Sequence, residues 1–204
     1  MKRVGLFIGV NLYSNGISRL EFAKNDAMKL SDCFLSKGYQ VERLLNDEVT
    51  YDGILNMLER IRNSLAAGDL FVLYFAGHGM EIGGRPYLLC ADADDRMETQ
   101  RGKMPLQDLI TYSEKSGIHR LFILDSCRRE ILSGDRGDAY VCGDSRDPAL
   151  KRIINECPSC PPLILTSCSR GEKAYEYAEQ RRGLFTWVLE KVLNDKKQPV
   201  CDFH

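Results

Sequence analysis

A cysteine and a histidine, two residue types that can act together as nucleophile and proton acceptor, each follow an apolar run in this sequence. Cys127 follows the run at 121–124, and His78 follows the run at 70–76. Apolar runs without helical spacing are typical of strands buried on both faces of a parallel sheet. Ligands bind beyond the carboxyl ends of such strands, so a thiol and an imidazole there would be placed for chemistry. A thiol attacks as the thiolate, and a nearby histidine can take its proton and later deliver it to a leaving amine.

Each of these two residues also has a plainer interpretation. Free cysteine is among the most buried residue types, so Cys127 could be a packing residue at a strand end. His78 lies between two glycines and could be a turn histidine that makes one local hydrogen bond. The two residues are more informative together, because a right-handed crossover between their strands would bring the two strand ends side by side. We therefore predict a Cys127–His78 dyad.

The segments that must position this dyad alternate between strand-like and helix-like patterns. This alternation predicts an α/β fold with a mostly parallel central sheet flanked by helices. The expected strands lie at 4–10, 40–45, 70–76, 121–124 and 163–166, with a hairpin at 83–89. The expected helices are one that starts near 25 and is closed by Gly38, and others at 51–65, 105–112 and 184–193.

Composition narrows the classes of partner. Lys and Arg total 28 against 29 for Asp and Glu in 204 residues, so no global field favours nucleic acid or an anionic membrane, and neither is expected as a partner. The apolar N-terminal run is short and predicts a first strand, and no apolar segment is long enough to span a bilayer. Eight cysteines without a secretory signal predict reduced thiols and a cytoplasmic location.

One pair of cysteines offers an alternative function. Cys157 and Cys160 form a lone CxxC, which cannot by itself supply the four ligands of a structural zinc site, although Cys142 or Cys168 could join it. No metal is predicted. A thiol redox sensor that uses Cys157 and Cys160 stays open as an alternative and predicts a disulfide-dependent change in gel mobility.

At the two predicted strand ends the sequence resembles the caspase-like cysteine peptidases, the clan of caspases, metacaspases and paracaspases. Residues 73–79, Leu-Tyr-Phe-Ala-Gly-His-Gly, resemble the family's histidine motif, and residues 122–129, Phe-Ile-Leu-Asp-Ser-Cys-Arg-Arg, resemble its cysteine motif. The two basic residues after the cysteine make the resemblance closest to paracaspases. The resemblance covers nearly the whole chain. It implies a caspase-like three-layer sandwich in a single domain at 1–204, with a large-subunit-like portion at 1–130, a linker at 131–161 and a small-subunit-like portion at 162–204.

The resemblance also implies roles for individual residues. Cys127 would be the nucleophile that forms a thioester, His78 the general acid and base, and the backbone N–H groups of Gly79 and Cys127 the oxyanion hole. No third member of a triad is evident in the sequence. No cofactor is implied, although metacaspases often need calcium. A calcium site could involve Asp92, Asp94 and Asp95, but a solvated acidic loop would use the same residues.

The resemblance further predicts the specificity pocket. Asp125 and Asp26 match acidic positions of the S1 pocket, Glu176 would be a third acid, and Tyr175 would lie beside the S2 side chain. Three converging carboxylates suit a guanidinium, so the expected substrate is a peptide or protein with Arg, or possibly Lys, at P1, the residue before the scissile bond. Asp26 could instead be an acid that favours the start of a helix, and Glu176 one of many charges in its segment.

These expectations combine into one function, with a non-enzymatic alternative beside the redox sensor. The predicted function is a cysteine endopeptidase that cleaves after basic residues, in a regulated signalling or defence role, with an activating partner or domain and a possible homodimer. The alternative is a catalytically silent regulatory or scaffold module of the same fold. Self-cleavage during activation could use basic residues in and just before the linker, namely Arg128, Arg129, Arg136, Arg146, Lys151 and Arg152.

Overall fold

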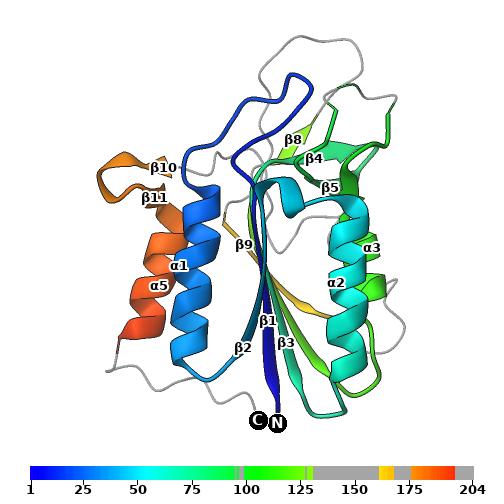
Figure 1. Ribbon diagram of the computed structural model, residues 1–204, viewed down its shortest axis with the longest axis vertical. Coiled ribbons are helices and arrows are strands. Elements are labelled where there is room, and N and C mark those ends of the chain that lie inside the picture. The colour runs from blue at the N-terminus through cyan, green and yellow to red at the C-terminus, as the bar shows by residue number, and fades with distance from the viewer. Residues whose placement is uncertain (95, 97–98, 127, 131–160, 168–175, 196–204) are drawn as a thin grey trace.

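The central sheet has five parallel strands, and helices cover both of its faces (Figure 1). The structure, a computed structural model, describes residues 1–94, 96, 99–126, 128–130, 161–167 and 176–195. The strand order is β2-β1-β3-β7-β9. The strands are β1 (Arg3–Gly9), β2 (Gln40–Leu45), β3 (Leu70–Ala76), β7 (His119–Asp125) and β9 (Leu163–Thr166). The predicted α/β sandwich is confirmed.

One face of the sheet packs against α1 (Ala23–Ser36) and α5 (Leu184–Asn194), and the other against α2 (Tyr51–Ser64) and α3 (Leu106–Tyr112). Alternate residues of β3 explain this arrangement: Val72 and Tyr74 join the first core, while Phe71 and Leu73 join the second. Burying such a side chain contributes about 1.5–3 kcal/mol, so both faces of the apolar strand favour the sandwich.

A second, four-stranded sheet continues from the carboxyl ends of the central strands. Its order is β6-β5-β4-β8, where β4 is Gly79–Ile82, β5 is Arg85–Leu89, β6 is Lys103–Pro105 and β8 is Arg128–Glu130. The predicted hairpin is confirmed as β4 and β5, with Gly83 and Gly84 at positive φ in its turn. Short elements complete the described chain: η1 (Asn46–Glu48), β10 (Glu176–Tyr177), η2 (Ala178–Gln180) and β11 (Arg182–Gly183).

The element boundaries differ from the sequence prediction in ways that tertiary contacts explain. The first helix begins at Ala23, where the side chain of Asn11 accepts a hydrogen bond of 2.7 Å from the N–H of Lys24. Pro105 belongs to β6 and precedes α3 rather than starting it. Strand β7 extends to Asp125 because the pairing with β3 continues to Ala76. Strand β8 was not predicted, since three residues carry too little pattern to indicate a strand.

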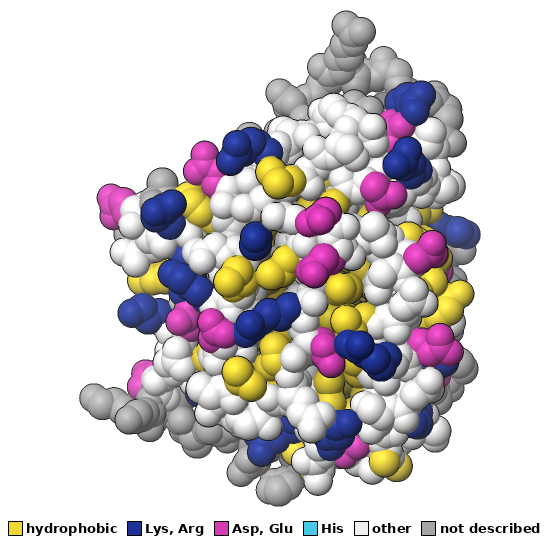
Figure 2. Space-filling model, viewed as in Figure 1, with side chains coloured by type: hydrophobic (Ala, Val, Ile, Leu, Met, Phe, Trp, Pro, Cys, Tyr) yellow, Lys and Arg dark blue, Asp and Glu magenta, His cyan; other side chains and the backbone are white. Residues whose placement is uncertain are grey.

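The surface shows mixed charge. On the face drawn in Figure 2, basic and acidic side chains of the described residues are interspersed, and apolar side chains lie between them. No described helix combines the length and the hydropathy that a bilayer crossing would require.

Candidate active site

The histidine segment and the cysteine segment leave the central sheet side by side. At the ends of β3 and β7, Ala76 pairs with Asp125, and at the starts of β4 and β8, Gly79 pairs with Arg128. In the sequence, His78 lies between Ala76 and Gly79, and Cys127 lies between Asp125 and Arg128. Cys127 itself is outside the described residues. The described neighbours of the two residues are therefore adjacent, as the crossover argument predicted.

The imidazole of His78 is held by the segment between β1 and α1. Its Nε2 lies 2.8 Å from the carbonyl oxygen of Ser18, and its ring centroid lies 4.9 Å from that of Tyr13. A carbonyl oxygen can only accept a hydrogen bond, so Nε2 carries the proton in this contact. The neutral ring then has Nδ1 as its basic nitrogen. This arrangement suits a general base whose tautomer is set by a backbone carbonyl.

The sequence did not reveal this carbonyl partner. Ser18 contributes only its backbone oxygen, which any residue type could supply, so no side-chain signal marks it. Tyr13 adds a second contact, because its hydroxyl accepts a hydrogen bond of 2.7 Å from the backbone N–H of His78. The glycine before His78 is required sterically, since a Cβ at Gly77 would lie 2.7 Å from that hydroxyl and 2.9 Å from the ring of Phe75.

Two of the predicted pocket acids lie together. Asp26 is in the first turn of α1 and Asp125 ends β7, and they are only 2% and 9% exposed. A Cβ built on Gly183 would lie 3.0 Å from Oδ2 of Asp26 and 3.1 Å from Oδ2 of Asp125. The two carboxylates, which are far apart in sequence, therefore converge on one glycine of β11. Asp125 is also close to the histidine segment, because its carbonyl accepts a hydrogen bond of 3.3 Å from the N–H of Gly77.

Both carboxylates accept hydrogen bonds from the segment at 182–186. Gly183 N–H donates to Oδ2 of Asp26 at 2.8 Å, and Thr186 Oγ1 donates to Oδ2 of Asp125 at 2.7 Å. Because the hydroxyl hydrogen of Thr186 is used in this way, the Tyr74 hydroxyl, 2.6 Å away, must donate to Thr186 Oγ1. The acids thus also connect the front of the chain to its rear segment.

Burial controls the ionisation of this pair. It raises the pKa of Asp26 to about 7, an effect that the hydrogen bond from Gly183 opposes and the neighbouring charge of Asp125 reinforces. Burial also raises the pKa of Asp125, against the hydrogen bonds from Thr186 and Ser167. A pair of this kind gains from a cation placed next to it.

The other two predicted pocket residues are only partly within the described chain. Glu176 begins β10, and its backbone pairs with Gly183, the glycine on which the two aspartates converge. This position is compatible with a third acid, although the structure does not describe the side chain. Tyr175 lies outside the described residues, as do Cys142, Cys157, Cys160 and Cys168. Cys33 and Cys90 are free and buried.

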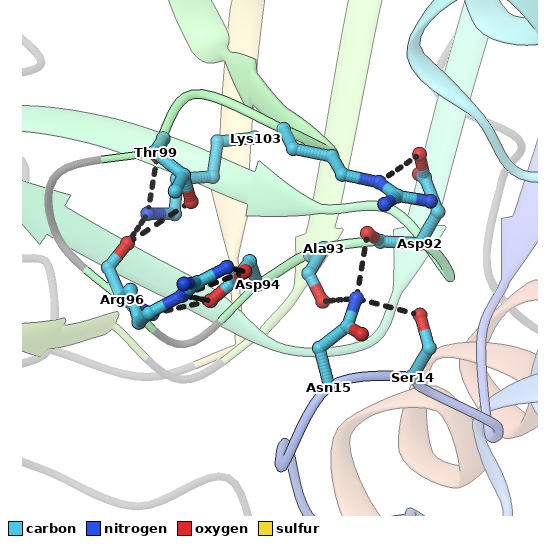
Figure 3. Close-up of polar contacts among 9 residues, drawn as sticks. Ser14, Asn15, Asp92, Ala93, Asp94, Arg96, Thr99 and Lys103 are labelled. Atoms are coloured by element: carbon cyan, nitrogen blue, oxygen red, sulfur yellow. Dashed lines mark hydrogen bonds and ion pairs between the residues drawn. The ribbon is translucent and has the colours of Figure 1, made fainter.

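The acidic loop that could have held calcium is occupied by cations of the chain itself (Figure 3). The carboxylate of Asp94 accepts hydrogen bonds from the backbone N–H and the Nε of Arg96, both at 2.9 Å. Buried Lys103 donates from Nζ to the carbonyl oxygens of Arg96 and Thr99. Asp95 lies outside the described residues. Across the described part of the chain, no three His, Cys, Asp or Glu side chains are grouped so that they could hold a metal ion.

Comparison with known proteins gives a family and a fold. The family model of the caspase domain matches residues 2–204. A search of curated proteins gave no match. Among solved structures, the chain is similar to a structural-genomics crystal structure of a protein from Geobacter sulfurreducens, with 19% identity and a TM-score of 0.52. That alignment covers 62% of this chain and 51% of the other, so this chain spans about half the length of the solved one.

Proposed function

This chain belongs to the caspase domain family, a family of cysteine peptidases, and on that premise we propose that it is an endopeptidase that cleaves after arginine, and also after lysine. The observation that carries the specificity is the convergence of the Asp26 and Asp125 carboxylates next to the histidine segment. Two basic residues after Cys127 support a closer relation to paracaspases within the family. The proposed substrate is a peptide or protein, and the proposed regulation is an activating partner or domain.

The proposed chemistry uses His78 and Cys127 in two steps. Nδ1 of His78 takes the thiol proton, and the thiolate attacks the carbonyl carbon of the scissile bond. The N–H groups of Gly79 and Cys127 stabilise the negative charge on the carbonyl oxygen. His78 then protonates the leaving amine, which leaves a thioester on Cys127. Water hydrolyses this thioester while His78 again acts as base, and the contact of Nε2 with Ser18 keeps the ring oriented.

The proposed specificity follows from charge and geometry. A guanidinium has five N–H donors in a plane and forms paired hydrogen bonds with carboxylates, so Asp26 and Asp125, with Glu176 as a third acid, would favour it. Lysine offers three donors at a single point and would bind more weakly. An aspartate at P1 would meet like charge in a buried site, which is strongly unfavourable.

The decisive test compares substrates that differ only at P1. Purified protein is incubated with fluorogenic peptides that end in arginine, lysine or aspartate, with Cys127→Ala as control. We expect turnover of the arginine peptide, weaker turnover of the lysine peptide and none by the variant. Peptidyl chloromethyl ketones add a labelling test, in which the arginyl reagent should modify Cys127 and the aspartyl reagent should not. Equal labelling by both reagents would remove the acidic-pocket argument.

One observation favours a second candidate, a catalytically silent regulatory or scaffold module. Both pocket acids already accept hydrogen bonds from Gly183 and Thr186, as they would if their role were to hold the rear segment. This candidate predicts no labelling of Cys127 under any condition. The peptide assay, repeated with calcium and at protein concentrations that promote a dimer, separates the two candidates.

A further inference from the structure

A buried arginine lies against one member of the acidic pair, Asp26. Arg182, the first residue of β11, is 5% exposed, and its Nε lies 3.4 Å from Oδ1 of Asp26. Its Nη1 pairs with the carboxylate of Glu190, which is nearly two turns into α5. The side chain therefore runs along α5 between this helix and α1, away from the strand-end loops. Figure 1 shows the two helices side by side, with β11 above the start of α5.

The guanidinium of Arg182 is not fully paired. Its Nη2 is buried and has no hydrogen-bond partner in the described part of the chain. A buried guanidinium is expensive unless anions surround it, and here the anions are Asp26 and Glu190. Arg182 therefore keeps an unused hydrogen-bond donor, Nη2, while its other nitrogens contact Asp26 of α1 and Glu190 of α5.

Arg182 is the cation that the described part of the chain places next to the Asp26 carboxylate. Asp125 of β7 and Tyr74 of β3 also interact with this carboxyl, and both are acids, while Glu190 of α5 pairs with Arg182 itself. Burial raises the pKa of Asp26, and Arg182 lowers it both by its charge and by its hydrogen bond. Removal of Arg182 would therefore favour a protonated, neutral Asp26.

We propose that Arg182 is a positioning and specificity-determining residue for the P1 cation, because its guanidinium, paired with Oδ1 of Asp26, favours the ionised form of that carboxylate and fixes its orientation. The inference rests on the proposed function, since it concerns the pocket that would bind the substrate arginine. Asp26 keeps capacity for that substrate, because each carboxylate oxygen can accept two hydrogen bonds and only one contact per oxygen is used here.

The opposite role for Arg182 is that of an internal competitor. If Arg182 filled the pocket as an internal substitute for the substrate arginine, its removal would empty the pocket and strengthen substrate binding. A counter-cation and an internal competitor therefore predict opposite changes of KM. The position of Glu190 along α5 favours the counter-cation, since it draws the guanidinium away from the strand ends.

The experiment measures kcat and KM for a fluorogenic peptide that ends in arginine, from about pH 5.5 to 9. The proteins are the wild type, Arg182→Met, Arg182→Lys and the control Arg181→Met, which removes the neighbouring exposed arginine. We expect Arg182→Met to raise KM by up to about tenfold near pH 7 and to move the midpoint of the KM profile to higher pH, because a pKa increase of about one unit has that effect. We expect kcat to change little, Arg182→Lys to restore most of the wild-type profile and Arg181→Met to resemble the wild type.

A second variant keeps the inference testable if Arg182→Met does not fold. In Glu190→Gln the guanidinium has one fewer competing carboxylate, so it should stabilise ionised Asp26 more strongly and move the KM midpoint to lower pH. Direct titration of the Asp26 carboxyl by carbon-13 NMR in the same proteins gives a readout that needs no substrate. It should show the midpoint higher in Arg182→Met and lower in Glu190→Gln.

The outcomes separate the inference from the proposed function. Unchanged Asp26 titration in folded Arg182→Met and Glu190→Gln, or a decrease of KM in Arg182→Met, overturns the role of Arg182. A lower melting temperature without any change in either pH profile also overturns it, because that result describes a purely structural arginine. Absence of arginine-peptide cleavage by the wild type, together with the expected NMR shifts, overturns the proposed function and leaves the role of Arg182 towards Asp26 standing.

Discussion

At the scale of single residues, His78 is held by two residues of the segment between β1 and α1. Ser18 supplies a carbonyl oxygen to Nε2, and Tyr13 supplies a hydroxyl oxygen to the backbone N–H and a ring face to the imidazole. A general base must be oriented to within a narrow range, so these contacts should influence the rate more than the binding of substrate.

We expect Tyr13→Phe to lower kcat with little change of KM. The variant keeps the aromatic ring but removes the acceptor of the hydrogen bond from the His78 N–H, and such a bond contributes about 0.5–1.5 kcal/mol. A decrease of kcat by up to about tenfold corresponds to a barrier increase of about 1.4 kcal/mol. Steady-state kinetics with an arginine peptide measure the effect, and Tyr112→Phe, at an exposed tyrosine, is the matched control. An unchanged kcat in a folded variant would contradict the role of Tyr13.

The ionisation of Asp26 also makes stability depend on pH. Its pKa in the folded chain is about 7, above the value of about 3.9 for an unfolded aspartate. Between these pH values the folded state binds more protons at this carboxyl than the unfolded state, so the contribution of Asp26 to stability falls as pH rises. Asp26→Asn has no group that titrates there.

We therefore expect the free energy of unfolding of the wild type, minus that of Asp26→Asn, to decrease from about pH 4 to about pH 7. The decrease should be at most about 1.4 kcal/mol per pH unit. Urea denaturation of both proteins at several pH values gives this difference. A difference that is constant or that increases with pH would show that Asp26 ionises as readily as in an unfolded chain.

At the scale of elements, the loop between β5 and β6 is held by its own cations. Lys103, the first residue of β6, is buried and donates to the carbonyl oxygens of Arg96 and Thr99, while Arg96 pairs with Asp94 (Figure 3). A guanidinium of the chain thus neutralises Asp94, and an ammonium binds two carbonyl oxygens of this loop. Since β6 pairs with β5 and β5 with β4, the loop belongs to the sheet that continues from His78.

We expect Lys103→Met to destabilise the fold. The substitution removes the ammonium from the carbonyl oxygen of Thr99 and leaves that of Arg96 with its contacts to Thr99, and a hydrogen bond to a charged group contributes about 1.5–3 kcal/mol. Thermal unfolding should show a clearly lower melting temperature, whereas Lys37→Met, at an exposed lysine after α1, should behave like the wild type. Equal melting temperatures for the two variants would mean that the loop does not depend on this ammonium.

The contacts in this loop also predict that calcium does not change the melting temperature of the protein. Because Arg96 and Lys103 already engage the Asp94 carboxylate and two carbonyl oxygens of the loop, a calcium ion that used these oxygens would have to displace the two side chains and would gain little. The melting temperature of the wild type should be equal in calcium chloride and in a chelator, to within the scatter of the measurement. A reproducible increase with calcium, retained in Asp94→Asn, would place a calcium site elsewhere in the chain.

At the scale of the whole molecule, the front and rear portions of the chain are joined by contacts that do not need the linker. Helix α5 packs through Phe185, Leu189 and Leu193 on the core of α1, and the carboxylates of Asp26 and Asp125 bind the segment at 182–186. A break in the linker should therefore leave the two portions associated.

We expect the active protein to cleave its own linker, with the two fragments remaining associated without a covalent bond. Arginine residues such as Arg136 and Arg146 suit the proposed pocket, so incubation should give two fragments on a denaturing gel, and Cys127→Ala should remain intact. The two fragments should elute together in gel filtration, since burial of apolar side chains holds them. An intact wild type under every activating condition would argue against self-cleavage. The activating partner, the homodimer and the cytoplasmic location stay predictions.

Much of the fold follows from local patterns. The apolar run at 70–76 predicted β3 with the bounds that the structure has, because a strand buried on both faces must be apolar throughout. The expected strands at 40–45 and 163–166 also have the bounds of β2 and β9. The Gly83-Gly84 turn predicted the hairpin for a similarly local reason. Strand β8, the start of α1 and the end of β7 depend on neighbours that are distant in sequence, and for this reason they were missed or misplaced.

By itself, the sequence determined the order of most strands and helices and the placement of His78 and Cys127 after two buried strands, since periodicity and apolar runs are properties of neighbouring residues. Only the tertiary structure decided which groups surround these residues. The Ser18 carbonyl on His78, the convergence of Asp26 and Asp125 on Gly183, and Arg182 beside Asp26 all join segments far apart in the chain. Such contacts depend on how the helices and loops pack on the sheet, and a backbone oxygen or a buried arginine leaves no pattern in the sequence that would reveal its partner.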